Sequence, residues 1–369
     1  MRDSITNLTN LNEEMASYII YGIILIVLIA MIMYIIYISR LRQSNCNRMN
    51  DLYTTLNGSI RPINANDPDC KYKFSEYYMK TAYNACSGGS YRNDFVDICN
   101  LKSVLRQGVR CLDFEIYSIN NKPCVATSTG TDYYVKETFN YVNFLDVMET
   151  IKNYAFSGST APNNTDPVVI HFRFMSNNQK MFDNLATLLQ SYDSMLLGKE
   201  YSFESYGKNL GDTPLLDFMN KIIIIANRSN TAFIENEALM EYINMTSGSI
   251  FMRALPYFEV KNSPDMDELR DFNRRNMTIV FPDNGINPPN PSGILCREAG
   301  CQMVAMRYQY VDDFLNENNM FFDEGAYAFV LKPERLRYKP VEIKEATPQN
   351  PELSYQTREF KTDFYSFNI

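Results

Sequence analysis

The sequence is poor in the side chains that most often carry acid–base and metal chemistry. Its 369 residues include one histidine, His171, and no tryptophan. A single histidine excludes metal sites built from several histidines, and it excludes a mechanism in which two histidines act as acid and base. Acidic residues outnumber basic ones, because 35 Lys and Arg stand against 43 Asp and Glu, for a formal charge of -8. Nucleic acid is therefore not expected as a partner.

The sequence also lacks the paired cysteines of a zinc site. It contains eight cysteines, and none of them forms a Cys-x-x-Cys pair. Cys296 and Cys301 lie close together in the chain, but no matching cysteine or histidine partners accompany them. Several other cysteines lie inside apolar strand-like runs, where a free thiol behaves as a small hydrophobic side chain. The pattern favours reduced thiols in a cytosolic setting.

The stretch from Gly108 to Tyr117 places two carboxylates inside an apolar run, reading Gly-Val-Arg-Cys-Leu-Asp-Phe-Glu-Ile-Tyr. Asp113 and Glu115 are two residues apart, and side chains alternate faces along a strand, so both point the same way. Burying unpaired charge among apolar neighbours is too costly to leave uncompensated. The pair therefore indicates a cation site, an ion pair with a basic side chain or a substrate pocket. A solvent-facing edge strand is the alternative.

A long apolar segment follows the short polar N-terminus of residues 1–16. No charged residue occurs in residues 17–39, which are rich in Ile, Leu, Val, Met and Tyr. This segment exceeds the roughly 20 residues of a membrane-spanning helix, and neither a basic leader nor a small-residue cleavage site marks it as a signal peptide. Three arginines follow it within residues 40–48, and only Arg2 precedes it. The positive-inside rule therefore predicts that the C-terminal portion lies on the cytoplasmic side.

The rest of the chain divides into a linker, a folded domain and a tail. Residues 40–72 are rich in Asn, Asp, Ser and Pro, which predicts a juxtamembrane linker. Strand-like and helix-like segments alternate over residues 73–340, which predicts a parallel α/β fold, and a (β/α)8 TIM-type barrel suits one domain of this size. The tail of residues 341–369 is irregular and ends in aromatic residues. The predicted strands are 111–117, 123–126, 167–174, 221–226, 277–281, 302–308 and 326–331, and the predicted helices are 143–156 and 180–197.

Two parts of the sequence are similar to the two halves of the catalytic barrel of phosphoinositide-specific phospholipase C. In the second half, Ala299–Gln309 reads Ala-Gly-Cys-Gln-Met-Val-Ala-Met-Arg-Tyr-Gln, and Tyr327–Arg337 reads Tyr-Ala-Phe-Val-Leu-Lys-Pro-Glu-Arg-Leu-Arg. In the first half, Leu105–Glu115 resembles the family's Gly-x-Arg-Cys-x-Glu-x-Asp strand, and Asp166–Arg173 resembles its Pro-Val-Ile-Leu strand. The resemblance covers about residues 75–340. It implies a (β/α)8-type barrel, calcium dependence and cleavage of inositol phospholipids.

The resemblance places other residue types where the family has its two catalytic histidines. The family's Ser-x-His-Asn-Thr segment corresponds to Lys80–Cys86, so Tyr83 replaces the first histidine. The family's His-Gly-His loop corresponds to Ala126–Thr129, and Thr129 replaces the second. A tyrosine hydroxyl titrates near about 10 and a threonine hydroxyl outside the useful range, so neither suits proton transfer at neutral pH. No catalytic residue is expected at these positions.

The calcium ligands that the resemblance implies also differ from the family pattern. They correspond to Asn84, Asp113, Glu115 and Arg173, so three oxygen donors remain and an arginine replaces the fourth ligand. The guanidinium adds a fixed positive charge where the ion needs a carboxylate, and its planar fork can bridge Asp113 and Glu115. We therefore predict a remnant calcium site with Arg173 as its counter-ion. No cofactor is expected, and calcium is expected only if the barrel is an active enzyme.

His171 lies two residues before Arg173 and faces the same side of its strand. It is the candidate for a substitute general base. A lone base lacks the acid partner that phosphodiester cleavage requires, so a partner for Glu115 or a core histidine is the favoured interpretation.

These observations predict a single-pass membrane protein with a degenerate phospholipase-C-like barrel that serves a structural or binding role. Its expected partners are the membrane and either a phosphoinositide headgroup or a protein. The alternatives are an active phosphodiesterase with relocated catalytic groups and a non-catalytic headgroup-binding module. The composition would also suit a large DNA virus, which makes a virion membrane one expected location.

Overall fold

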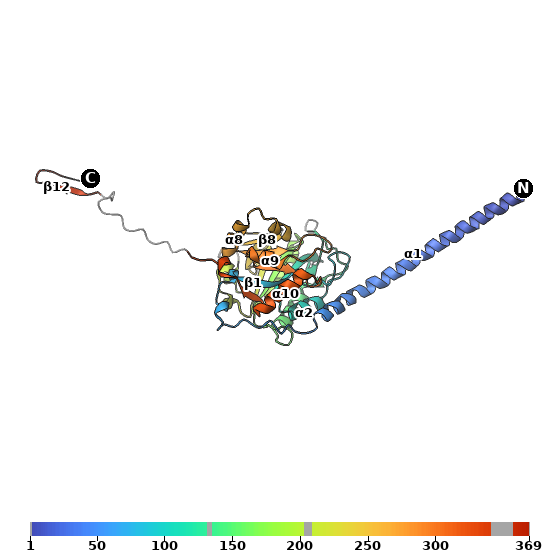
Figure 1. Cartoon of the computed structure of the whole chain (residues 1–369), viewed down its shortest axis with the longest axis horizontal. Helices are drawn as coiled ribbons and strands as arrows, with labels where there is room; N and C mark the ends of the chain where they lie inside the picture. Colours follow the sequence, from blue (N-terminus) through green and yellow to red (C-terminus); the bar gives the residue numbers. More distant parts are fainter. Residues whose placement is uncertain (1, 131–134, 203–208, 341–356, 369) are drawn as a thin grey trace. The chain divides into compact units, whose positions relative to one another are not determined.

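The structure is a computed structural model, and it describes residues 2–130, 135–202, 209–340 and 357–368. The chain divides into two compact units, Met1–Arg337 and Tyr338–Ile369. The first unit contains a long N-terminal helix and a barrel (Figure 1). The functional residues predicted from the sequence all lie in this first unit.

Eight parallel strands form a nearly closed barrel in the order β7, β6, β5, β2, β1, β10, β9, β8. Within the described part of the chain, no ladder joins β7 to β8, so the barrel is open between these two strands. The predicted TIM-type architecture is confirmed. The eight strands are β1 (Tyr77–Ala82), β2 (Cys111–Ile119), β5 (Val168–Phe174), β6 (Ile222–Asn227), β7 (Met245–Ser247), β8 (Met252–Pro256), β9 (Met277–Phe281) and β10 (Met303–Met306).

Three short strands pair in antiparallel fashion with the barrel or with each other, and helices connect the barrel strands. The short strands are β3 (Lys122–Ala126), which pairs with β2, β4 (Val142–Asn143), which pairs with β3, and β11 (Phe329–Leu331), which pairs with β1. The helices are α2 (Ile98–Arg106), α3 (Phe144–Thr150) with a π-helical turn (Ile151–Ala155), α4 (Gln179–Gln190), α6 (Glu237–Met240), α7 (Tyr257–Lys261), α8 (Met266–Arg275), α9 (Gly293–Glu298) and α10 (Asp313–Gly325). Single 3-10 turns lie at Pro68–Cys70, Phe74–Glu76, Lys199–Tyr201, Leu210–Asp212, Leu215–Phe218, Ala232–Glu235 and Glu334–Leu336.

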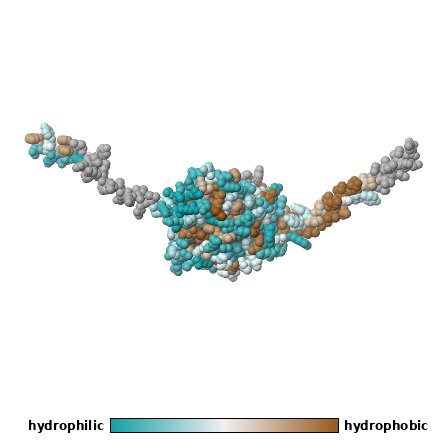
Figure 2. All heavy atoms as spheres, viewed as in Figure 1, coloured by the Kyte–Doolittle hydropathy of each residue, from teal (hydrophilic) through white to brown (hydrophobic). Residues whose placement is uncertain are grey.

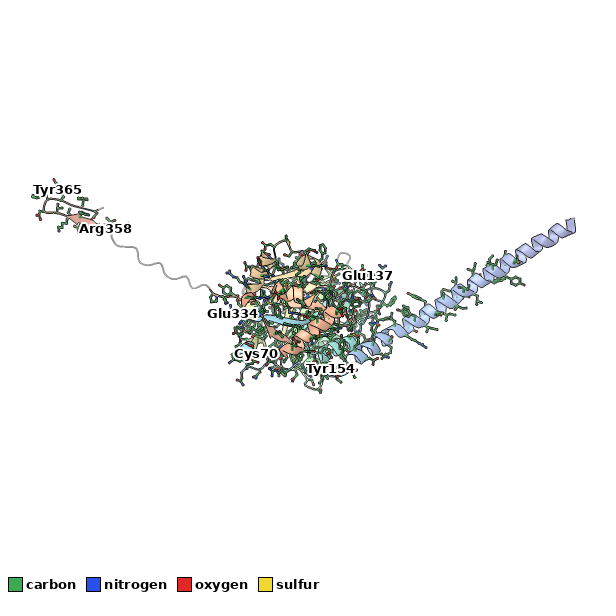
Figure 3. All side chains as sticks on the ribbon, viewed as in Figure 1. Cys70, Glu137, Tyr154, Glu334, Arg358 and Tyr365 are labelled. Atoms are coloured by element: carbon green, nitrogen blue, oxygen red, sulfur yellow. A yellow bond between two sulfur atoms is a disulfide. The ribbon has the colours of Figure 1, made fainter. Side chains whose placement is uncertain are left out.

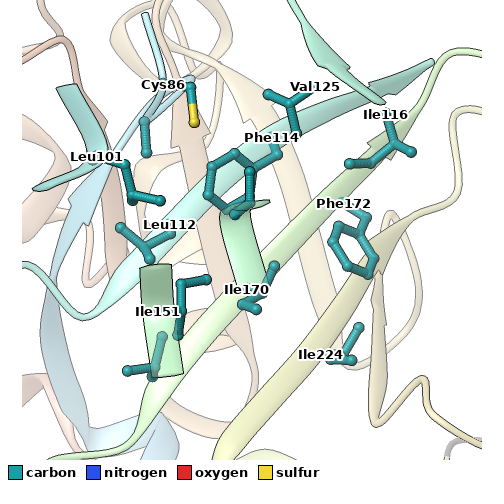
Figure 4. Packing of buried hydrophobic residues seen from close by; sticks show 14 of the residues in the cluster. Cys86, Leu101, Leu112, Phe114, Ile116, Val125, Ile151, Ile170, Phe172 and Ile224 are labelled. Atoms are coloured by element: carbon teal, nitrogen blue, oxygen red, sulfur yellow. The ribbon is translucent and has the colours of Figure 1, made fainter. Parts of the chain in front are cut away.

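The barrel strands are buried on both faces, which explains their nearly continuous apolar sequence. On β2, Leu112, Phe114 and Ile116 point outward and pack with residues of the neighbouring strands and helices (Figure 4). Side chains of the opposite parity point into the barrel. Near the amino ends of the strands, this interior is filled by apolar side chains that include Met79, Met245, Met252, Met277 and Met303. Polar side chains collect at the opposite end, near the carboxyl ends of the barrel strands.

Helix α1 (Arg2–Leu52) contains the apolar segment that the sequence predicts as membrane-spanning. From Met15 it is long and apolar enough to cross a membrane and lies near the N-terminus, as membrane anchors and signal sequences do. Its apolar side chains form the brown segment of Figure 2. Residues 40–52, which the sequence predicts as part of a linker, continue this helix. The composition is indeed polar there, but Met49 and Tyr53 are buried against the barrel domain.

One disulfide joins α1 to the barrel domain. It links Cys46 on α1 to Cys99 on α2. The expectation of reduced thiols throughout is therefore wrong for these two cysteines. They are 53 residues apart, and the sequence spacing did not indicate that folding brings them together. The other six cysteines are free and buried.

The second unit contains a small antiparallel hairpin of β12 (Glu359–Lys361) and β13 (Ser366–Asn368). The rings of Phe360 and Phe367 stack across it, with centroids 6.0 Å apart. Figure 3 labels two of its residues, Arg358 and Tyr365. The predicted irregular tail falls partly on residues 341–356, which lie outside the described residues.

Candidate functional site

Two neighbouring strands bring four of the predicted site residues together near their carboxyl ends. In the parallel register of β2 and β5, Asp113 lies opposite His171 and Glu115 lies opposite Arg173. All four side chains point into the barrel and are buried, with at most 7% exposure. The carboxyl end of barrel strands is the end where TIM-barrel active sites form. We call the loops at this end the rim.

The Arg173 guanidinium lies between the two carboxylates. Its Nε donates to Asp113 Oδ1 at 3.0 Å and its Nη2 donates to Asp113 Oδ2 at 2.7 Å. Its Nη1 donates to Glu115 Oε1 at 2.9 Å. A second hydrogen bond from Nη2 reaches Asn84 Oδ1 at 2.9 Å. The fork of Arg173 thus makes a two-point contact with Asp113 and joins three of the four residues that correspond to calcium ligands.

Further donors occupy the remaining carboxylate lone pairs. Glu115 accepts hydrogen bonds from the Tyr117 hydroxyl at 2.7 Å and from the Ser128 backbone N–H at 2.9 Å. Asn84, whose positive φ of 44° lies in the left-handed region that Asn tolerates, donates from its amide to Glu115 at 3.2 Å. Its backbone N–H also points to Asp113 Oδ2, at 3.3 Å. The two acids are therefore held by protein donors on several sides.

The charge of Arg173 determines the protonation of its neighbours. Burial raises the pKa of Asp113, but the Arg173 charge and the His171 hydrogen bond outweigh it and lower that pKa to about 2. Burial conversely lowers the pKa of Arg173, while the nearby Asp113 raises it well above its ordinary value. Both groups are therefore charged at neutral pH, and they form a buried ion pair.

Tyr83, which the sequence resemblance predicts in place of the first family histidine, covers this ion pair. The Arg173 guanidinium carbon lies 4.5 Å from the centre of the Tyr83 ring and 5.5 Å from that of Phe281. Burial raises the pKa of Tyr83 far above its ordinary value, so its hydroxyl stays protonated at neutral pH. Tyr83 thus acts here as a cation–π partner of Arg173.

Thr129, which the sequence resemblance predicts in place of the second family histidine, lies on the rim and has no hydrogen bond to Asp113 or Glu115. Its backbone N–H and its hydroxyl both donate to Glu137 Oε2, at 2.6 and 2.5 Å. The sequence analysis did not identify Glu137. These bonds hold the loop that contains Thr129 in place. Ser128, the residue before Thr129, donates its backbone N–H to Glu115.

His171 is buried and bonds Asp113 rather than Glu115, which agrees with the core-histidine interpretation and not with a partner for Glu115. Its Nδ1 lies 2.8 Å from Asp113 Oδ1, and its Nε2 lies 2.8 Å from the Ser247 hydroxyl. Both ring nitrogens therefore have partners inside the barrel. The contact with Ser247 was missed because the two residues are 76 positions apart in the chain.

A pocket of about 440 Å³ opens on the rim beside the ion pair. Its wall combines polar and cationic side chains with aromatic and proline surface, a combination suited to a polar headgroup attached to an apolar chain. Arg228 contributes an exposed guanidinium to it. The lining residues include Tyr83, Arg173, Asn227, Arg228, Ser229 and Phe281.

The present residues do not fit a calcium ion at the family position. Calcium takes six to eight oxygen ligands, and here the guanidinium already bonds three of the four corresponding residues. In the described part of the chain, the single group of three potential metal ligands is Cys46, Asp97 and Cys99. Two of those side chains form the disulfide.

The Asp113 pKa leads to an acid-dependent stability. In the folded state this pKa is about 2, below its ordinary value of 3.8, so the pair stabilises the fold above pH 3.8 and loses that stabilisation as the pH falls toward 2. We expect a loss of about 2 kcal/mol from this group between pH 5 and pH 2. The measurement is urea unfolding of the detergent-solubilised full chain across this range. Asp113→Asn is the matched variant, and an unchanged pH slope in it would contradict the assignment.

Two family profiles match this chain, and together they span the barrel. The profile of the phosphatidylinositol-specific phospholipase C X domain matches residues 70–228, and that of the Y domain matches residues 222–335. None of the curated protein sequences compared with this chain matches it.

Two solved structures have a similar fold. PLC21 of L. pealei aligns with a TM-score of 0.59 at 19% identity, and PLC21 of S. officinalis with a TM-score of 0.54 at 18% identity. Each alignment covers 73% of this chain and 38% of the cephalopod chain. The chain thus spans well under half the length of these proteins. It carries the X and Y domains of the phosphatidylinositol-specific phospholipase C family.

Proposed function

We propose that this protein is a single-pass membrane protein whose phospholipase-C-like barrel binds the headgroup of an inositol phospholipid without hydrolysing it. The observation that carries the proposal is the Arg173 guanidinium between Asp113 and Glu115. It supplies internally the positive charge that a calcium ion supplies in the family. Without the ion and without both histidines, the barrel lacks the groups that activate the inositol hydroxyl and stabilise the phosphate.

Headgroup binding is supported by the rim pocket and by Arg228. An exposed guanidinium in a pocket that also offers amide and hydroxyl groups suits a phosphate with neighbouring hydroxyls. Arg173 is less suited to this role, because most of its N–H groups already bond protein oxygens. The phosphate is therefore assigned to Arg228.

The test is to incubate the full-length protein with phosphatidylinositol vesicles and measure both inositol phosphate release and vesicle binding. We expect no release with or without calcium, and binding that weakens about tenfold in Arg228→Gln, the value of one charge-assisted hydrogen bond. Lys180→Gln removes one positive charge from the start of α4 and is the matched control, expected to bind as the unchanged protein does. Calcium-dependent release of inositol phosphate would overturn the non-catalytic assignment.

An active phosphodiesterase is the second candidate, and the His171 contacts favour it. Asp113 holds one ring nitrogen of His171 and the Ser247 hydroxyl meets the other, the arrangement of an oriented base. Against this, the ring is fully buried and does not line the rim pocket. Hydrolysis that is lost in His171→Asn would establish this candidate.

Two observations give opposite predictions for the side of the membrane on which the barrel lies. The arginines that follow the apolar segment support the cytoplasmic side, whereas the Cys46–Cys99 disulfide supports an oxidising compartment. We assign the cytoplasmic side, because flanking charge acts during membrane insertion, before a disulfide can form. Protection of the barrel from protease added outside intact cells is expected, and its digestion there would reverse the assignment. A virion membrane stays a prediction.

A further inference from the structure

The end of α1 beyond the apolar segment is fixed to the barrel at several points. At the first, Arg42 Nε donates to Asp97 Oδ2 at 2.6 Å. At the second, Asn45 Nδ2 donates to Asp94 Oδ1 at 2.7 Å, a buried contact. Both acceptors lie in the loop that follows β1 or at the start of α2, and both therefore belong to the rim.

The next turns of α1 are fixed further down the barrel wall. The disulfide joins Cys46 to Cys99, in the first turn of α2. One turn later, Met49 is fully buried in the core that surrounds the barrel. Beyond α1, the Tyr53 hydroxyl donates to the Tyr308 backbone oxygen at 2.7 Å.

The contacts furthest from the rim involve the last turn of α2. Arg106 donates to the Asn50 side chain at 3.3 Å and to the Tyr53 backbone oxygen at 3.0 Å. The backbone N–H of Asn57 then bonds the Arg106 carbonyl at 3.0 Å. The segment is therefore held against the barrel by a covalent bond, by buried side chains and by an ion pair. We call residues 42–53 the strut.

The order of these contacts gives the direction of the strut. Residue 42 lies beside the start of α2, and residue 50 lies beside its end, so the two helices run antiparallel. The start of α2 lies on the rim, because it follows the loop that leaves β1. The end of α2 lies at the opposite end of the barrel, which we call the base, because the chain there enters β2. Followed backward from Tyr53 to Arg42, the chain therefore climbs from the base to the rim.

The apolar segment leaves the barrel at the rim. Arg42 lies three positions after Ser39, which is about 4.5 Å of helix, and α1 continues into the apolar segment without a break. We propose that the strut holds the rim of the barrel toward the bilayer that contains α1, so that the pocket binds lipid headgroups of that bilayer and of no other. The ligand half of this proposal rests on the headgroup binding proposed above.

A flexible linker would have the opposite consequence. A disordered stretch of the 33 residues from 40 to 72 would let the barrel turn in any direction and reach neighbouring membranes. The strut replaces the first part of that stretch with a short rigid connection. The pocket then meets its ligand at the high local concentration of a shared surface.

Lipid-headgroup quenching tests the orientation without any specific ligand. A dye is placed at an exposed rim residue, in Ile286→Cys, or at an exposed base residue, in Asn66→Cys. Ile286 follows β9, and Asn66 lies near Ile63, whose N–H bonds Asp166 just before β5. The full-length labelled protein is placed in phosphatidylcholine vesicles that carry nitroxide headgroups. We expect several-fold stronger quenching of the rim dye, and equal or stronger quenching of the base dye would overturn the proposal.

A flexible Gly-Ser insertion between Ser39 and Arg40 is the matched variant. It keeps every strut contact but separates the strut from the membrane, so the rim-to-base quenching ratio should fall toward one. An unchanged ratio would mean that the strut does not set the orientation.

Energy transfer from the rim dye to headgroup-labelled phosphatidylinositol tests the restriction to one membrane. We expect transfer when the lipid is in the protein's own vesicle and none when it is in separate vesicles. The insertion variant should gain transfer to separate vesicles. Equal transfer to both by the unchanged protein would overturn the restriction. Transfer to labelled phosphatidylinositol that is no stronger than transfer to equally labelled phosphatidylcholine would overturn the headgroup assignment, while the quenching ratio still decides the orientation.

Discussion

Arg173→Glu should create a calcium site at the position that the guanidinium now occupies. The substitution removes the guanidinium and places a carboxylate beside Asn84, Asp113 and Glu115, which together supply the oxygen ligands that calcium prefers. Without the ion, three buried carboxylates repel one another and the variant should be strongly destabilised. Calcium at about 100 times its dissociation constant should restore about 2.7 kcal/mol of stability. Calorimetric titration and thermal unfolding with and without calcium measure both effects.

Arg173→Gln is the control for this substitution. It removes the same positive charge but adds no carboxylate, so it should bind calcium weakly or not at all. Equal calcium binding by both variants would show that the new carboxylate is not a ligand. Even with calcium bound, Arg173→Glu should not release inositol phosphate if Tyr83 and Thr129 occupy the positions of the two family histidines, as the sequence resemblance predicts.

Arg173→Met should cost about 3–5 kcal/mol of stability, because it removes one partner of a buried ion pair. The methionine keeps much of the side-chain volume, but it leaves Asp113 and Glu115 buried at 0% and 1% exposure without a counter-ion. The free energy of unfolding in urea, compared with that of the unchanged protein, measures the loss.

Two further variants separate charge from packing in this experiment. Arg228→Met removes an exposed arginine from the same rim and should change stability by less than about 0.5 kcal/mol. Adding Asp113→Asn and Glu115→Gln to Arg173→Met removes the stranded charges and should recover part of the loss. A loss below about 1 kcal/mol in Arg173→Met would contradict the buried ion pair.

The fold was predictable where the sequence pattern is strong. The runs that contain β2, β5, β6 and β9 consist largely of apolar residues, and they were recognised as strands. Three barrel strands were missed. β1 reads Tyr-Tyr-Met-Lys-Thr-Ala, and its buried Lys80 conceals the strand. β7 reads Met-Thr-Ser and β8 reads Met-Arg-Ala-Leu-Pro, so neither contains a continuous apolar run.

The site was predictable only in part. The two-residue spacing of Asp113 and Glu115, and of His171 and Arg173, is enough to place each pair on one face of its strand. Tyr117 has the same parity as Glu115, a signal that would have identified it as a further partner. Ser247 gave no such signal, because its contact depends on the curvature of the closed barrel.

The juxtamembrane region shows why composition alone was misleading. Polar residues at 40–52 indicated a linker, yet several of them pair with the barrel domain. Arg42 bonds Asp97, Asn45 bonds Asp94 and Asn50 bonds Arg106. A polar helix face that meets polar groups of a folded domain has the same composition as a solvated one.

Calcium titration of the unchanged full-length protein tests the central claim most directly, because that claim places a guanidinium where the family binds its ion. We expect no heat of binding attributable to this site and no calcium-dependent rise in unfolding temperature. Calcium bound by Asp113 and Glu115, detected by titration and abolished in the double variant Asp113→Asn and Glu115→Gln, would contradict it.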